Sequence, residues 1–138
     1  PERKKLEKRA GKNIKFLGWQ NDDVLREYYS KAQAFIFPGE EDFGITPVEA
    51  QASGTPVIGY GRGGLLETVI DGVTGLFFNE QTPESIIDAV KRFEKMKKNF
   101  DRRKMLENAR KFDVGIFEKN IKDFIEKQYN EYCLKYEL

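Results

Sequence analysis

The sequence predicts one α/β domain, a parallel sheet flanked by helices and followed by C-terminal helices. Short apolar runs alternate with amphipathic segments between residues 13 and 96, and strands that alternate with helices form units whose strands run parallel. The apolar run at 34–37 stops at Pro38-Gly39, which is typical of a buried strand. Thr82-Pro83-Glu84 combines a capping hydroxyl, a proline in the first turn and an acid, and so indicates a helix start.

The other elements follow from local patterns. Residues 2–11 are charged and favour a helix up to Gly11, whereas residues 13–18 alternate apolar and polar side chains as a short strand does. Asn21 or Asp22 can cap the next helix. The apolar side chains of that helix are spaced as on one buried face: Val24, Leu25, Tyr28, Tyr29 and Ala32. The remaining expected elements are a strand covered on both faces at 34–37, a helix at 48–53, a strand at 56–60, a helix at 65–70, an edge strand at 75–78 and a helix from 83.

From about Asp101 onward the pattern is purely helical. Large apolar side chains recur at helical spacing and are expected in the core or on a docking face: Phe117, Ile121, Phe124, Ile125, Tyr132 and Tyr136.

Composition excludes several classes of protein. The 138 residues include no histidine and a single cysteine, Cys133. Without histidine there is no Ser-His-Asp or Cys-His catalysis and no histidine-ligated zinc. One cysteine forms no internal disulfide, which fits a cytoplasmic protein. The net charge of +1 excludes an intrinsically disordered chain of the kind that has a high net charge and low hydrophobicity.

The charge is unevenly distributed. Residues 16–90 hold three basic and twelve acidic residues, and the segments on either side are basic. The basic stretches, such as 97–104, are interrupted by acids and are typical of solvated helix faces, so no nucleic acid partner is predicted. Contact of these basic segments with an anionic membrane surface is an open but less favoured alternative.

Three loops follow the carboxyl ends of expected strands, where ligands bind in folds of this class: 18–22, 38–46 and 59–64. The middle loop carries Glu40-Glu41-Asp42 before a helix whose start is indicated by Thr46 and Pro47. Backbone N–H groups at that start can hold a phosphate, although acids before a helix also simply stabilise its dipole. A metal site built from the three acids is not favoured, because adjacent residues rarely converge on one ion.

The third loop, Gly59-Tyr60-Gly61-Arg62-Gly63-Gly64, matches the G-x-G-x-x-G spacing of dinucleotide-binding proteins. The helix expected after it has only about two turns, and the match falls on the third expected strand rather than the first. A dinucleotide-binding or non-catalytic α/β module therefore remains the alternative function.

Residues 38–58 resemble the signature of retaining glycosyltransferases that include bacterial and archaeal mannosyltransferases and sucrose synthase. That signature has two glutamates separated by seven residues, here Glu41 and Glu49, within a P-x-x-x-E-x-F-G pattern. Residues 38–44 read P-x-x-E-x-F-G, one residue shorter between the proline and the glutamate than that pattern. The pattern E-A-x-A-x-G-x-P-V-I follows at residues 49–58. Further similarity covers residues 2–96, through Asn13–Gly18, Gly63–Glu67, Asp71–Gly75 and Thr82–Glu84.

The resemblance implies a Rossmann-like sheet, the C-terminal, donor-binding half of a GT-B fold. Residues 1–112 would form this donor-binding domain without its first strand, and 113–138 a helix that packs on the domain or toward an absent N-terminal, acceptor-binding domain. The donor would be GDP-mannose or a UDP-sugar, transferred with retention to an acceptor hydroxyl. The departing phosphate would serve as the base, and no metal or other cofactor is expected.

The resemblance also implies roles for individual residues. Glu41 would contact the hydroxyls of the donor sugar as the catalytic residue, and Glu49 would bind the ribose hydroxyls. The main chain at Trp19-Gln20 would contact the base. Backbone amides would meet the sugar and the diphosphate at four consecutive positions: Phe43, Gly44, Ile45 and Thr46.

One feature of the family is missing. The arginine and lysine that bind the diphosphate in the family follow a strand that is not found before residue 13, and Arg62 is the only basic residue expected near a pocket loop. We therefore expect this chain alone to transfer no sugar and to bind a nucleoside diphosphate weakly. The expected location is cytoplasmic, with peripheral contact at the inner membrane face if the acceptor is lipid-linked.

Overall fold

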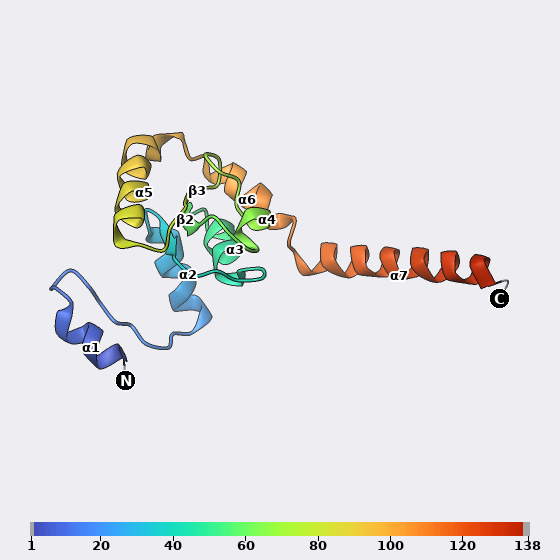
Figure 1. Ribbon diagram of the computed structural model, residues 1–138, viewed down its shortest axis with the longest axis horizontal. Coiled ribbons are helices and arrows are strands. Elements are labelled where there is room, and N and C mark those ends of the chain that lie inside the picture. Colours follow the sequence, from blue (N-terminus) through green and yellow to red (C-terminus); the bar gives the residue numbers. More distant parts are fainter. Residues whose placement is uncertain (1, 137–138) are drawn as a thin grey trace.

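A computed structural model describes residues 2–136 and contains a three-stranded parallel sheet with helices on both faces (Figure 1). The strands are β1 (Phe35–Phe37), β2 (Val57–Tyr60) and β3 (Gly75–Phe78), in the order β1-β2-β3. The helices are α1 (Glu2–Arg9), α2 (Asp22–Lys31), α3 (Ile45–Ala52), α4 (Leu65–Thr68), α5 (Pro83–Met96), the 3₁₀ turn η1 (Lys97–Asn99), α6 (Arg102–Arg110) and α7 (Val114–Tyr136). The predicted fold class, a parallel sheet flanked by helices and followed by C-terminal helices, is confirmed.

The core has two halves, one on each face of the sheet, because successive strand residues point to opposite faces. One half packs against α5 and consists of Ile58, Tyr60, Leu76, Phe78, Ala89 and Phe93. The other half packs against α3 and α4 and consists of Ala50, Val57, Leu65 and Val69. Gly59 faces α4, and a Cβ there would lie closer than 3.0 Å to Leu65. The helix can therefore approach the sheet closely only over a glycine.

Hydrogen-bonded caps explain where the main helices begin. Asn21 accepts a hydrogen bond from the Val24 amide at 3.0 Å at the start of α2. Thr82 accepts one from the Ser85 amide at 3.3 Å, and Pro83 opens α5 as predicted. The capping patterns in the sequence therefore identified both helix starts.

The expected strand at 13–18 is wrong. No strand forms there within the described chain, and Ile14 is 52% exposed. Consequently β1 is an edge strand whose central residue, Ile36, is 45% exposed, and the expectation that it is covered on both faces is also wrong. An alternating pattern becomes a strand only when a partner strand accepts its hydrogen bonds. In this structure β1 pairs with β2, and residues 13–18 do not pair with β1.

The predicted edge strand at 75–78 is confirmed as β3, whereas two helix boundaries differ from the expected ones. α3 begins at Ile45, three residues before the expected start at 48, and α4 ends at Thr68 because Val69 adopts an extended conformation. The five residues expected on one buried face of α2 are not buried: Val24, Leu25 and Tyr29 are half-buried, and Tyr28 and Ala32 are exposed.

The last helix, α7, extends away from the sheet (Figure 1), and none of its described side chains is buried. Its apolar residues were expected in the core or on a docking face: none of the described ones lies in the core, and the docking face stays a prediction. Of the two expected arrangements, packing on the domain is not found, and packing toward another domain stays a prediction. The helices in residues 2–136 are all too short or too polar to cross a membrane.

Candidate active site

The acidic loop between β1 and α3 lies at the carboxyl edge of the sheet and is supported from behind by the turn between β2 and α4. The Gly64 amide donates a hydrogen bond to the Glu41 carbonyl at 2.7 Å. A Cβ at Gly63 would lie closer than 3.0 Å to the Glu41 carbonyl, and one at Gly64 would lie equally close to the main chain of Asp42 and Phe43. Because they have no Cβ, these two glycines allow the turn to lie directly against the main chain of the acidic loop.

This contact also accounts for the G-x-G-x-x-G spacing. The helix that follows the turn, α4, has only four residues, and the Gly64 amide is already used by Glu41. A dinucleotide fingerprint instead needs glycines that leave room for a pyrophosphate at the start of a longer helix. The glycines here hold the acidic loop in place.

Gly44 forms the corner between the acidic loop and α3. It is the N-cap residue, it is buried, and it adopts a left-handed conformation with φ 81°. It has no side chain to cap the helix, so the amides of the first turn, at Ile45 and Thr46, receive no cap from it. Such amides, at the positive end of the helix dipole, can bind an anion.

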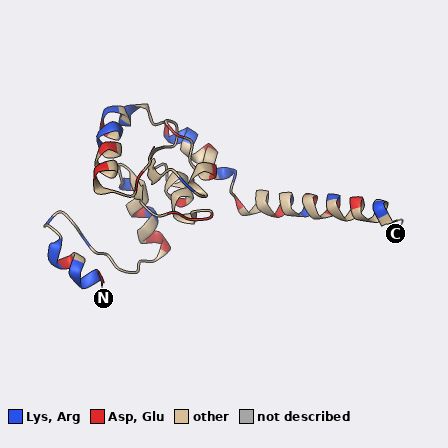
Figure 2. Ribbon diagram, viewed as in Figure 1, with Lys and Arg blue, Asp and Glu red and all other residues tan. Residues whose placement is uncertain are grey.

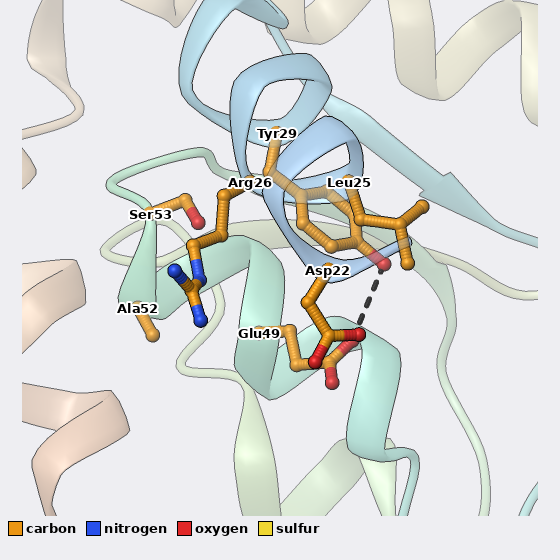
Figure 3. A pocket seen from close by; sticks show the side chains of 7 residues that line it. All are labelled: Asp22, Leu25, Arg26, Tyr29, Glu49, Ala52 and Ser53. Carbon is orange, nitrogen blue, oxygen red and sulfur yellow. Dashed lines mark hydrogen bonds between the residues drawn. The ribbon is translucent and has the colours of Figure 1, made fainter. Parts of the chain in front are cut away.

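Glu49 lies one turn further along α3 and borders a hollow of about 310 Å³, here called the α2–α3 hollow. The Tyr29 hydroxyl donates a hydrogen bond to Glu49 Oε2 at 3.5 Å (Figure 3). Burial raises the pKa of Tyr29, and the charge of Glu49 raises it further, so the phenol keeps its proton at neutral pH. The side chains that line this hollow are Asp22, Leu25, Arg26, Tyr29, Glu49, Ala52 and Ser53.

A second, more apolar hollow of about 520 Å³ lies on the opposite side of Glu49, between α3 and α6. Phe43 and Ile45 line it together with Phe112 and Arg110. The rings of Phe43 and Phe112 pack edge to face, with centroids 5.5 Å apart. Glu49 thus lines both hollows.

The structure brings six of the eight predicted site residues to one corner of the fold. The acidic loop and the start of α3 hold them: Glu41, Phe43, Gly44, Ile45, Thr46 and Glu49. Trp19 and Gln20 lie on the segment before α2, close in sequence to Asp22, which lines the α2–α3 hollow. The Trp19 side chain is 88% exposed, and Gln20 Nε2 donates to the Leu17 carbonyl at 2.7 Å. The role of their main chain in base binding stays a prediction.

The residues that line the hollows but were not predicted as site residues include Arg26, Tyr29 and Arg110. The expectation that Arg62 is the only basic residue near the site is therefore wrong, because Arg26 lines the same hollow as Glu49 (Figure 3). Arg62 instead lies over the Tyr60 ring, with its guanidinium carbon 5.9 Å from the ring centroid. A signal was present on α2, where Asp22, Arg26 and Tyr29 are spaced by four and three residues and so share one helix face.

The basic segments that flank the acidic middle of the sequence lie mainly on helices in the structure. Figure 2 shows basic residues concentrated on α1 and at the end of α5. Across residues 2–136, no three Cys, Asp or Glu side chains are grouped in a way that could hold a metal ion.

Comparison with known proteins identifies the family. The model of the family described as glycosyl transferases group 1 matches residues 1–112. The chain belongs to this family. It is 39% identical over 80 residues to an uncharacterized glycosyltransferase of Methanocaldococcus jannaschii, covering 57% of this chain and 20% of that protein. It is 40% identical over 80 residues to the D-inositol 3-phosphate glycosyltransferase of Actinosynnema mirum, covering 57% of this chain and 19% of that protein.

The structure resembles one half of a known family fold. The sucrose-phosphate synthase of Thermosynechococcus elongatus superposes with a TM-score of 0.69 and 29% identity, over 97% of this chain and 34% of that one. The sheet and its helices are therefore a GT-B C-terminal domain of the glycosyltransferase family. The chain spans about a fifth of the length of the curated relatives it matches.

Proposed function

We propose that this chain is the donor-binding part of a glycosyltransferase that uses a nucleotide-diphosphate sugar. The observation that carries the proposal is the position of Glu41 and Glu49 in a chain of this family: both lie on the loop and helix at the carboxyl edge of the sheet. In folds of this class, ligands bind at that edge.

Each part of the site has a role in this proposal. The first-turn amides of α3 bind the diphosphate. The Glu49 carboxylate accepts hydrogen bonds from the ribose hydroxyls, since one carboxylate can accept several donors. Glu41 accepts hydrogen bonds from the hydroxyls of the sugar.

The proposed reaction is retaining transfer of a hexose, such as mannose from GDP-mannose or a sugar from a UDP-sugar, to an acceptor hydroxyl. The bond between the anomeric carbon and the diphosphate breaks, the acceptor oxygen bonds to the same face of that carbon, and the acceptor proton passes to the departing phosphate. The chain's own residues hold the donor, and the base is a group of the substrate. No metal or other cofactor takes part in this scheme.

A second domain is part of the proposal. α7 buries no described side chain and exposes Phe117 and Phe124 by 63% and 59%. We assign this apolar surface to contact with an acceptor-binding domain that is not part of this chain. The basic residues that line the two hollows are Arg26 and Arg110, one in each, so we expect the chain by itself to bind a nucleoside diphosphate weakly and to transfer no sugar.

Nucleotide binding tests the proposal. GDP, UDP, GDP-mannose, UDP-glucose and NAD are titrated into the chain, with backbone amide shifts and Trp19 fluorescence as readouts. We expect shifts at Gly44–Thr46 and Glu49 with a GDP or UDP compound, and weaker binding by Glu49→Gln. Glu126→Gln, on α7, is the matched control and should bind normally. Binding of NAD alone would favour the dinucleotide alternative and refute the proposal.

A further inference from the structure

Tyr29 is the one polar side chain of α2 that forms a hydrogen bond with α3 among the described residues. Its hydroxyl donates to Glu49 Oε2 at 3.5 Å, across twenty residues of sequence. Both side chains line the α2–α3 hollow, and the dashed line in Figure 3 joins them. This contact ties the carboxylate of Glu49 to a different element of the fold.

The Tyr29 ring is held firmly. It packs edge to face against Phe35, with centroids 5.4 Å apart and an interplanar angle of 85°. The Tyr29 carbonyl accepts a hydrogen bond from the Thr55 hydroxyl. The ring also packs against the half of the core that contains Ala50 and Val57. Because both ring and backbone are anchored, the hydroxyl has a defined position in the absence of a ligand.

Glu49 needs such an anchor. An exposed glutamate side chain loses rotamer entropy when a ligand fixes it, so a partner that fixes it beforehand favours binding. Asp22 lines the same hollow (Figure 3). The hydrogen bond from Tyr29 occupies Oε2 of Glu49 and leaves Oε1 to accept from a ligand. The 3.5 Å between the two oxygens is longer than the ~2.5–3.0 Å of a typical O–H···O hydrogen bond. Hydrogen bonds in functional sites are often long without a ligand and tighten when it binds.

We propose that Tyr29 is a positioning residue that holds the Glu49 carboxylate ready for the two neighbouring hydroxyls of a nucleotide ribose. This inference rests on the proposed function and adds to it a residue outside the two-glutamate motif. The chemistry it implies is recognition of a vicinal diol, whichever base the nucleotide carries.

The test compares Tyr29→Phe with Tyr28→Phe. The first removes the hydroxyl and keeps the packed ring. The second removes the hydroxyl of the adjacent tyrosine, which is 48% exposed and does not line the hollow. Binding is measured by amide-shift titration with GDP and UDP and with their 2′,3′-dideoxy forms, and circular dichroism verifies that each variant is folded.

We expect Tyr29→Phe to weaken binding of the ribonucleotide about 3- to 10-fold, as loss of one hydrogen bond does. Its affinity for the dideoxynucleotide should equal that of the wild type, because the diol is absent. Tyr28→Phe should bind both normally.

The possible failures are distinguishable. If the wild type binds a ribonucleotide and Tyr29→Phe binds it equally well, or if the variant weakens both forms alike, the positioning role is refuted and the proposed function stands. If the wild type binds neither GDP nor UDP at millimolar concentration, the proposed function fails and this inference fails with it.

Discussion

Substitution of Gly63 by alanine tests whether the turn between β2 and α4 supports the acidic loop. Gly63 has φ 59°, and a Cβ there would lie closer than 3.0 Å to the Glu41 carbonyl. Gly72 is a matched control, since its φ is 71° and a Cβ there meets nothing within 4 Å. Both substitutions force an L-residue into the left-handed region, which costs about 1–2 kcal/mol, offset by about 0.4–1 kcal/mol from the stiffer unfolded chain.

Only Gly63→Ala adds a clash, and the clash is with main chain that cannot rotate away. Overpacking of this kind costs about 1–3 kcal/mol. We therefore expect Gly72→Ala to lower the free energy of unfolding by about 1 kcal/mol and Gly63→Ala by about 2–4 kcal/mol.

The assay is urea denaturation followed by far-ultraviolet circular dichroism, with equal m-values as the condition for comparison. Equal losses in the two variants would refute the reasoning, because they would show that the acidic loop moves freely away from the turn. Under the proposed function, Gly63→Ala should also weaken donor binding, since it displaces the Glu41 main chain.

Three further changes test the packing. Asn108→Ala removes buried hydrogen bonds to Gln51 Oε1 at 2.9 Å and the Thr68 carbonyl at 2.8 Å, so it should lower the free energy of unfolding by about 1–3 kcal/mol in urea; an unchanged midpoint would contradict this. Thr82→Ala removes the cap of α5 and should cost about 1 kcal/mol, whereas Thr82→Ser should retain most of the stability. Deleting residues 114–138 should leave the thermal midpoint of unfolding nearly unchanged, because α7 buries none of its described side chains. A drop of many degrees would instead show that α7 stabilises the domain.

Local sequence patterns predicted the elements that local chemistry determines. The apolar runs at 34–37, 56–60 and 75–78 became the three strands, and the capping residues Asn21 and Thr82 begin their helices. The α/β class and the corner that carries Glu41 and Glu49 also followed from the sequence. Each of these features depends on side chains within a few residues of one another.

Patterns could not show what depends on partners distant in sequence. Residues 13–18 alternate correctly but do not pair with β1. The apolar side chains of α7 have helical spacing, but none of the described ones is buried. The glycines at 63–64 serve a contact with the acidic loop some twenty residues earlier. The hydrogen bond between Tyr29 and Glu49 joins two helices, α2 and α3, that a strand and a loop separate in the sequence. A residue spacing does not contain such information.

The two glutamates have seven residues between them and are supported in different ways. The Glu41 main chain accepts a hydrogen bond from the Gly64 amide, and Glu41 is exposed. Glu49 is contacted at its carboxylate by Tyr29. Under the proposed function, the glutamate assigned to the ribose is therefore oriented before the donor binds, whereas the glutamate assigned to the sugar adjusts to it. That division suits a site in which every donor nucleotide carries the same ribose and the attached sugar varies.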